Sequence, residues 1–344
     1  INDVIFFSNT IQLTNFLFYL IGTIGLYKIL KKFGYKRSSI YISLSIMHFI
    51  PKIIEMRVLL KPEILVFALL PWIIIGIDSY FELNNRKSLA LSLFPLALLI
   101  TAKGSIAGMI LIFLFIRYFS KINKENIKEL IIVLIVFGII CLGVGFENYN
   151  INELSFFEVT TTDNYKNVAD ISFLYNINFW DLYFSPTLGS HNNSFLGITL
   201  LDTFGDYFSV NLKSKDNYFT YYQTKPFNNF SRFHLELLLA LSFYIAIFSN
   251  LKNNNKINLF LASPLIGMGI LLLNSFGFPD KNFDPLKGDT MKPSYYAFFI
   301  AISFVFLICE VLKNNETYGK SVSIFILICF VFLLGFPKNN YQEI

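Results

Sequence analysis

Charged side chains are scarce in this chain. They make up 15% of its 344 residues, whereas hydrophobic residues make up 54%. The mean hydropathy is +0.55, which argues against a soluble domain. Cysteine is also rare, and Cys141, Cys309 and Cys329 all lie inside apolar runs. Their spacing matches no metal or redox motif, so we interpret them as small hydrophobic residues.

The sequence motifs of several soluble enzyme classes are absent as well. We find no Walker loop, GxSxG, HExxH, CxxC or dinucleotide fingerprint. The net charge of +5 does not indicate nucleic-acid binding, because the basic residues lie beside apolar runs where anionic lipid headgroups attract them. We therefore expect membrane lipids as partners, and no nucleic acid.

Long apolar runs recur along the sequence. They extend over about 16 to 20 residues, enough for a helix to cross the hydrocarbon core of a bilayer, and unpaired backbone groups are not tolerated there. We predict an all-α integral membrane protein with about ten transmembrane helices and one large extracytoplasmic loop. The helices are expected near residues 11–27, 39–51, 63–80, 88–101, 104–119, 130–146, 234–250, 257–276, 295–312 and 320–336.

Basic residues are concentrated in alternate connections between these runs. Residues 28–37, 78–87, 117–129, 251–256 and 313–320 hold fifteen of the 28 Lys and Arg. By the positive-inside rule these connections are cytoplasmic. Residues 88–119 could form one tilted helix or two short helices meeting at 101–105. We favour two, because two crossings keep every basic connection on the same face.

The remaining connections then face outward. They include both termini, the 51–63 turn, the 277–294 loop and a polar loop at 147–233, whose apolar patch at 194–201 is expected to pack against the membrane surface. We expect a single polytopic membrane domain over 1–344, in a bacterial inner membrane, with its active face extracytoplasmic.

One candidate site lies in residues 48–65, where charges cluster at the predicted outer boundary. Charged groups near membrane depth are costly unless they are paired or functional. Arg57 and Lys61 could both face a phosphate if the helix continues through them. Glu63 follows Pro62 at the start of the next helix. We interpret His48, Lys52 and Glu55, which lie in the same cluster, mainly as interface residues.

Other candidate residues also lie on the predicted outer side. Lys103 lies among apolar residues, where a cation requires an anionic partner. Asp289, Lys292 and Tyr295 mark the point where the chain re-enters the membrane. Asp202 and Asp206 lie among aromatic residues, an arrangement that suits sugar binding but equally suits a docked interfacial helix. The sequence identifies no certain cofactor and leaves open whether a divalent cation takes part.

Three segments together resemble the GT-C superfamily of polytopic glycosyltransferases, which includes protein O-mannosyltransferases and the aminoarabinose transferase of lipid A. RVLLKPEILVF resembles the Arg…Asp/Glu entry of an early helix. SFLGITLLDTFGDYF resembles the aromatic GDY segment of the outer loop. GDTMKPSYYAFF resembles the Lys-x-Arg-Tyr opening of a late helix, with Ser294 where arginine is usual.

This resemblance implies transfer of a sugar from a polyprenyl-phosphate donor to an acceptor on the outer face. It implies that cations hold the leaving phosphate, for which Arg57, Lys61, Lys103 and Lys292 are available. It also implies a carboxylate base in a first outer loop, and we expect that residue upstream of Ile1. The donor sugar, the acceptor and any protein partner are not specified.

Two other functions stay open. A polysaccharide polymerase or ligase also has many helices and one large outer loop, in which such enzymes tend to use arginine and histidine. A lipid-linked sugar flippase or other transporter commonly shows half-repeats and charges at the bilayer midplane. In this sequence the charges gather at one face, which favours the transferase.

Overall fold

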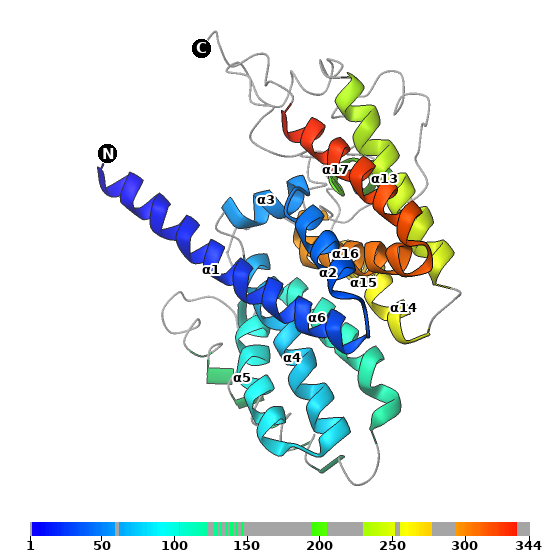
Figure 1. Cartoon of the computed structure of the whole chain (residues 1–344). Helices are drawn as coiled ribbons and strands as arrows, with labels where there is room; N and C mark the ends of the chain where they lie inside the picture. The colour runs from blue at the N-terminus through cyan, green and yellow to red at the C-terminus, as the bar shows by residue number, and fades with distance from the viewer. Residues whose placement is uncertain are drawn as a thin grey trace. The chain divides into compact units, whose positions relative to one another are not determined.

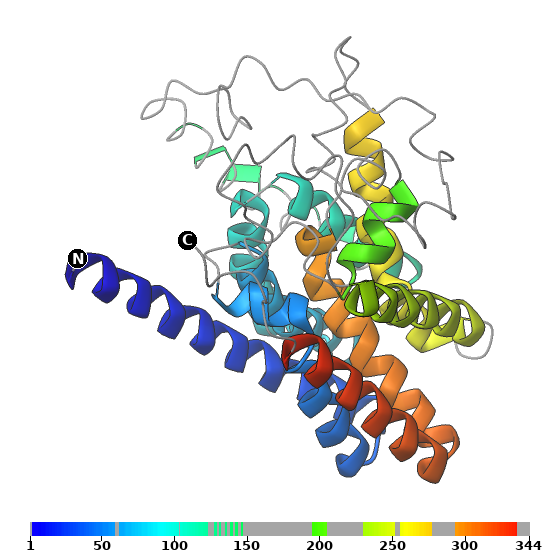
Figure 2. The same cartoon turned by 90° about the horizontal axis from the view of Figure 1, so that it is seen from above.

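The protein was analysed as a computed structural model, shown in two orientations in Figures 1 and 2. The structure describes residues 2–58, 62–102, 104–122, 195–204, 230–251, 255–276 and 293–335, together with isolated positions between 127 and 146. Over these residues all regular secondary structure is helical, without strands. The prediction of an all-α fold is therefore confirmed for the described part of the chain.

Four helices are long and apolar enough to cross a membrane. They cover Thr10–Lys32, Glu63–Leu83, Ala297–Asn314 and Glu316–Leu334, and shorter apolar helices cover His234–Asn250 and Ser263–Leu273. These helices support a membrane protein. The predicted total of about ten crossings is not confirmed, since helices such as 86–102 and 104–118 have only 17 and 15 residues.

The chain divides into two compact units. Unit 1 comprises residues 1–34 and 57–165, and unit 2 comprises residues 35–56 and 166–344. Each is described by itself, and the expectation of a single domain over 1–344 stays a prediction.

Unit 1 is built on two parallel helices, α1 (Asn2–Lys32) and α4 (Glu63–Leu83). The ring of Tyr19 stacks on Phe67 at one end of the pair, and Lys32 reaches Asp78 at the other. The two backbones approach closely because Gly22 faces Phe67, where a Cβ would collide with the backbone of α4. Small residues at such an interface are typical of helix pairs in membranes.

The next two helices of unit 1 settle the ambiguity at 88–119. They are α5 (Arg86–Ala102) and α6 (Gly104–Tyr118), followed by the short η1 (Phe119–Lys121). Gly76, late in α4, lies beside Ser92 in the first half of α5, and Tyr118 at the end of α6 bonds to Ile74 of α4. Because the start of α5 and the end of α6 lie beside the same turns of α4, the chain reverses between α5 and α6. The two-helix interpretation is correct.

Unit 2 is organised around α16 (Ala297–Asn314), fifteen of whose 18 residues are buried. A helix that is apolar on all sides belongs in the centre of a bundle. Its neighbours are α2 (Arg37–Met47), α13 (Phe230–Asn250), α14 (Asn255–Leu261), α15 (Ser263–Phe276) and α17 (Glu316–Gly335). Both views show α17 running alongside α16 (Figures 1 and 2).

Two predicted helices have different limits in the structure. The helix expected at 257–276 is two helices, α14 and α15, which meet at Ala262. Pro264 explains the break, because it has no amide hydrogen to continue the hydrogen bonding of α14. The helix expected at 39–51 ends at Met47, and a separate helix, α3 (Pro51–Val58), begins at a second proline. Residues 130–146 lie mostly outside the described residues.

Candidate functional site

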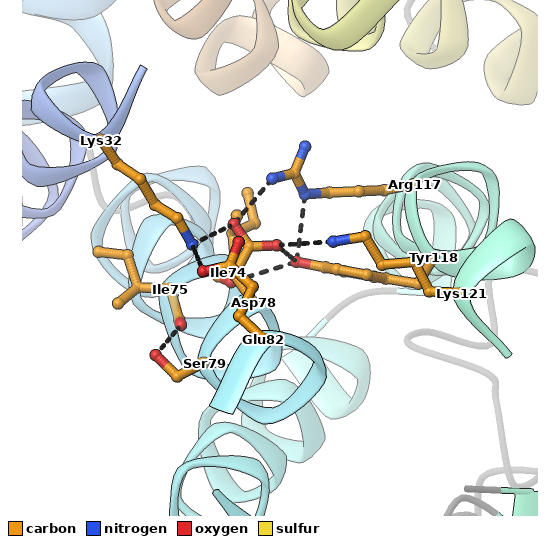
Figure 3. Close-up of polar contacts among 9 residues, drawn as sticks. All are labelled: Lys32, Ile74, Ile75, Asp78, Ser79, Glu82, Arg117, Tyr118 and Lys121. Carbon is orange, nitrogen blue, oxygen red and sulfur yellow. Dashed lines mark hydrogen bonds and ion pairs between the residues drawn. The ribbon is translucent and has the colours of Figure 1, made fainter. Parts of the chain in front are cut away.

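The densest set of charged side chains in the described part of the chain lies in unit 1, around Asp78 (Figure 3). Asp78 is five residues from the end of α4, and its side chain is 5% exposed. Lys32 reaches it from one side, from α1. Arg117, Tyr118 and Lys121 reach it from the other side, from α6 and η1. We call Lys32, Asp78, Glu82, Arg117, Tyr118 and Lys121 the Asp78 cluster.

Both carboxylate oxygens of Asp78 are engaged. Arg117 donates from Nη2 to Oδ2 at 2.9 Å, and Lys32 Nζ lies 3.3 Å from the same oxygen. The Tyr118 hydroxyl is 3.0 Å from Oδ1, and Lys121 Nζ is 3.9 Å away. Lys32 also pairs with Glu82 at 2.8 Å.

The charged groups of the cluster neutralise one another through ion pairs and hydrogen bonds. The most deeply buried carboxylate of the cluster receives hydrogen bonds from a guanidinium and a phenol, which is the condition for tolerating an ion inside a protein. The partly exposed Lys32 and Lys121 supply further positive charge toward the ends of the helices. The Asp78 cluster therefore joins α1, α4 and α6 and presents no unsatisfied group for chemistry.

The sequence analysis did not select these residues as a site. It assigned their segments to basic connections of one face, and the cluster does bring together the connections after α1, α4 and α6. A signal was available, because Asp78 is the only carboxylate between Ile64 and Phe81. A lone acid in an apolar helix indicates a cationic partner on another helix.

A different arrangement surrounds Arg57, at the other end of α4. Arg57 lies in the last turn of α3, is half-buried, and places its guanidinium carbon 5.1 Å from the centre of the Tyr19 ring. Its Nε is buried and has no hydrogen-bond partner among the residues that the structure describes. About 22 Å separates the two ends, from the rise of 1.5 Å per residue between Glu63 and Asp78. We call Tyr19, Arg57 and Phe67 the Arg57 site.

Glu63 begins α4, as predicted, and is 1% exposed. A carboxylate in the first turn of a helix is stabilised by the helix dipole. Lys52, which we had interpreted as an interface residue, is also buried, at 2% exposure. Lys61, which was predicted to share a phosphate with Arg57, lies outside the described residues.

The other predicted site residues fall in or near unit 2. The helix α11 (Phe195–Asp202) covers most of the apolar patch noted at 194–201, and Asp202 is its last residue. Tyr295 is half-buried in the short η4 (Pro293–Tyr296), and η4 packs against α11. Two of the three segments that carry the family resemblance thus lie side by side. Lys103, Asp206, Asp289 and Lys292 are outside the described residues, as is the side chain of Asp202.

The packing of α11 is held by polar as well as apolar contacts. The Thr203 hydroxyl lies 3.0 Å from the Tyr244 hydroxyl of α13, and the buried Phe204 contacts Phe243 and Phe330. These contacts fix the turn that follows α11, and with it the start of the FGDYF segment.

A buried carboxylate of unit 2 also has close polar contacts. Tyr35 donates to Glu310 of α16 at 2.6 Å, and Lys313 lies 3.6 Å from the same oxygen. Burial, together with the hydrogen bond to the carboxylate, raises the pKa of Tyr35 above its ordinary value. The phenol therefore stays protonated and continues to act as a donor.

Among the described residues, no group of three or more His, Cys, Asp or Glu side chains could hold a metal ion. Comparisons of the whole chain with protein-family models, curated proteins and solved structures give no match. Its function therefore has to be argued from these two sites and from the sequence.

Proposed function

We propose that the protein is a GT-C-like membrane glycosyltransferase with about ten transmembrane helices and one large extracytoplasmic loop. It would transfer a sugar from a polyprenyl-phosphate donor to an acceptor on the extracytoplasmic face. In this reaction the acceptor oxygen bonds to the anomeric carbon while the bond from that carbon to the phosphate oxygen breaks. The electron pair leaves with the phosphate, and the proton of the acceptor hydroxyl passes to a carboxylate.

The observation that carries this proposal is the buried Nε of Arg57, which has no partner among the described residues. Leaving a charged donor buried and unbonded costs about 1–3 kcal/mol or more. A guanidinium suits phosphate because its N–H groups can bind two oxygens at once. Placed before the reaction, such a cation stabilises the charge that develops on the leaving group.

A second observation supports the proposal independently. The packing of α11 against η4 joins the segment that leads into FGDYF to the segment that carries Tyr295. In the GT-C superfamily, which these segments resemble, the corresponding segments lie on the outer face. Aromatic side chains beside carboxylates are suited to binding sugar rings. The cytoplasmic face would then lie at the Asp78 cluster and the active face at the Arg57 site.

Release of polyprenyl phosphate tests the reaction. The purified chain in lipid nanodiscs is incubated with a panel of polyprenyl-phosphate sugars and of acceptors, and the released lipid phosphate is measured by mass spectrometry. We expect release from at least one donor, slowed about 100-fold by Arg57→Gln. Lys121→Gln is the matched control, because it removes an exposed cation at the other end of unit 1. Release from no donor, or an unchanged rate in Arg57→Gln, would contradict the proposal.

Cysteine labelling tests the orientation. In a background without native cysteines, single cysteines are placed at Asn84 and within 278–294. In intact cells, a membrane-impermeant reagent is expected to label the cysteines within 278–294 and not the cysteine at Asn84. After permeabilisation it should label the cysteines at both places. Labelling of both sets in intact cells would refute the proposed sidedness.

A further inference from the structure

We infer that Tyr19 is the positioning residue for Arg57, holding its guanidinium flat so that its N–H groups meet a phosphate in one fixed orientation. This inference rests on the proposed function, and it assigns a role to α1, in which the sequence analysis placed no site residue.

The geometry begins with the Tyr19 ring, which is fully buried. It stacks on Phe67 of α4 with ring centres 5.2 Å apart and planes inclined by 14°. The guanidinium carbon of Arg57 lies 5.1 Å from the centre of the Tyr19 ring. That distance is within the range of a cation–π interaction, so the Tyr19 ring restrains the guanidinium from one side.

The ring itself has little freedom to move. Gly22 brings the backbone of α1 against Phe67 one turn after Tyr19, and Thr23 donates a hydrogen bond to the Tyr19 carbonyl at 2.9 Å. The hydrogen bond holds the backbone of Tyr19, and close packing against Phe67 restricts the movement of the ring. A fixed ring in turn restricts the rotation of the Arg57 side chain before a ligand binds. Binding then costs less conformational entropy.

The orientation follows from the chemistry of the guanidinium. Its N–H groups all point outward in its own plane, whereas the faces carry no donor. A guanidinium held with one face toward the Tyr19 ring would leave its edge for phosphate oxygens. An ion pair with a carboxylate would have occupied that edge, as it does at Arg117.

The test measures binding rather than transfer. Farnesyl phosphate serves as the probe, with farnesol and inorganic phosphate as separate arms that distinguish a lipid phosphate from either of its parts. Equilibrium binding to the purified full chain is compared among the wild type, Arg57→Gln, Tyr19→Phe, Tyr19→Leu and the double variant Tyr19→Leu/Arg57→Gln.

We expect Arg57→Gln to weaken farnesyl phosphate binding by about tenfold or more. Tyr19→Leu should weaken it by about fivefold, whereas Tyr19→Phe keeps the ring and most of the affinity. The double variant should bind as Arg57→Gln alone does, because Tyr19 acts only through Arg57. Inorganic phosphate and farnesol should each bind more weakly than the probe.

Trp72→Leu is the matched control for folding. Trp72 lies in the same α1–α4 pair. The Lys28 ammonium is 4.4 Å from the centre of its ring, and its indole N–H donates a hydrogen bond to the Ile21 carbonyl. Its loss disturbs the pair at a similar depth without touching Arg57. Affinity for farnesyl phosphate should remain at the wild-type level in this variant.

The failures are distinguishable. If Tyr19→Leu binds like the wild type, if the two losses add in the double variant, or if Trp72→Leu weakens binding equally, the role of Tyr19 is refuted while the Arg57 proposal stands. If the wild type does not bind farnesyl phosphate, or Arg57→Gln binds it normally, both are overturned.

Discussion

The Asp78 cluster and the Arg57 site, at opposite ends of α4, differ in how the buried arginine is contacted. At the Asp78 cluster, Arg117 pairs with a buried carboxylate and also donates to the Tyr118 hydroxyl. At the Arg57 site, the guanidinium makes a cation–π contact with the Tyr19 ring, and its Nε has no hydrogen-bond partner among the described residues. The two arginines are similar in chemistry, and they differ in whether a carboxylate among the described residues pairs with the guanidinium.

This difference separates a structural charge from a binding charge. Removing one member of a buried ion pair leaves an uncompensated charge and destabilises the fold by several kcal/mol. Removing a cation that the fold does not neutralise relieves a desolvation penalty and affects mainly ligand binding. Four substitutions test this distinction in unit 1.

The largest effect is expected from Asp78→Asn. It should lower the free energy of unfolding by about 3–5 kcal/mol, because the Arg117 guanidinium loses its carboxylate while it stays buried. Reversible unfolding in mixed detergent micelles measures the loss. Glu82→Gln is the control, since Glu82 is 49% exposed and, among the described residues, pairs with the partly exposed Lys32 alone. A loss no greater than that of the control would show that the Asp78 cluster is not structural.

Tyr118→Phe should have a smaller effect on the same cluster. Its hydroxyl contacts Asp78 Oδ1 and the Ile74 carbonyl, 3.0 and 3.1 Å away. Loss of a buried donor between two acceptors should cost about 1–3 kcal/mol in the same unfolding measurement. Tyr318→Phe, which removes a hydroxyl from a residue that is 63% exposed, should be nearly neutral. Equal effects in the two variants would refute the role of the hydroxyl.

At the opposite end, Arg57→Leu should change the stability by less than about 1 kcal/mol. The lost cation–π contact and the relieved burial of Nε act in opposite directions and are similar in size. Release of polyprenyl phosphate should nevertheless fall as in Arg57→Gln. A destabilisation as large as that of Asp78→Asn would mean that the two ends do not differ.

The smallest effect is expected from Lys121→Gln. Its side chain is 39% exposed, and its ammonium lies 3.9 Å from Asp78, so the loss should be less than about 0.5 kcal/mol and should shrink further with salt. Unfolding at low and high ionic strength checks this expectation. A salt-independent loss above 1 kcal/mol would place Lys121 among the buried members of the cluster.

The sequence predicted local features of unit 1 better than long-range ones. Pro62 and Glu63 located the start of α4, and Thr101–Ser105 located the reversal between α5 and α6, because these signals lie within a few residues of the structure that they determine. The partners of Asp78 could not be identified in this way. They lie 39 to 46 residues away, and their pairing depends on how three helices pack.

The same limit applies to the binding site. Arg57 was singled out because charge is costly at membrane depth, and its buried Nε agrees with that reasoning. Tyr19 was missed, because one tyrosine among nineteen carries no local signal of the cation that it contacts. In α14 and α15, by contrast, Pro264 was a visible signal that was overlooked within a strongly apolar run.

The parallel arrangement of α1 and α4 also bears on how the protein is made. Between synthesis of these two helices the ribosome produces residues 35–56, which belong to unit 2 and whose α2 packs against α16. Tyr35 and Glu310 are 275 positions apart. While the residues between α2 and α16 are synthesised, α2 thus lacks this neighbour, and Ser39 and Ser43 lie on the side that α16 later covers. We expect an insertion chaperone to bind this face of α2 until α16 is made.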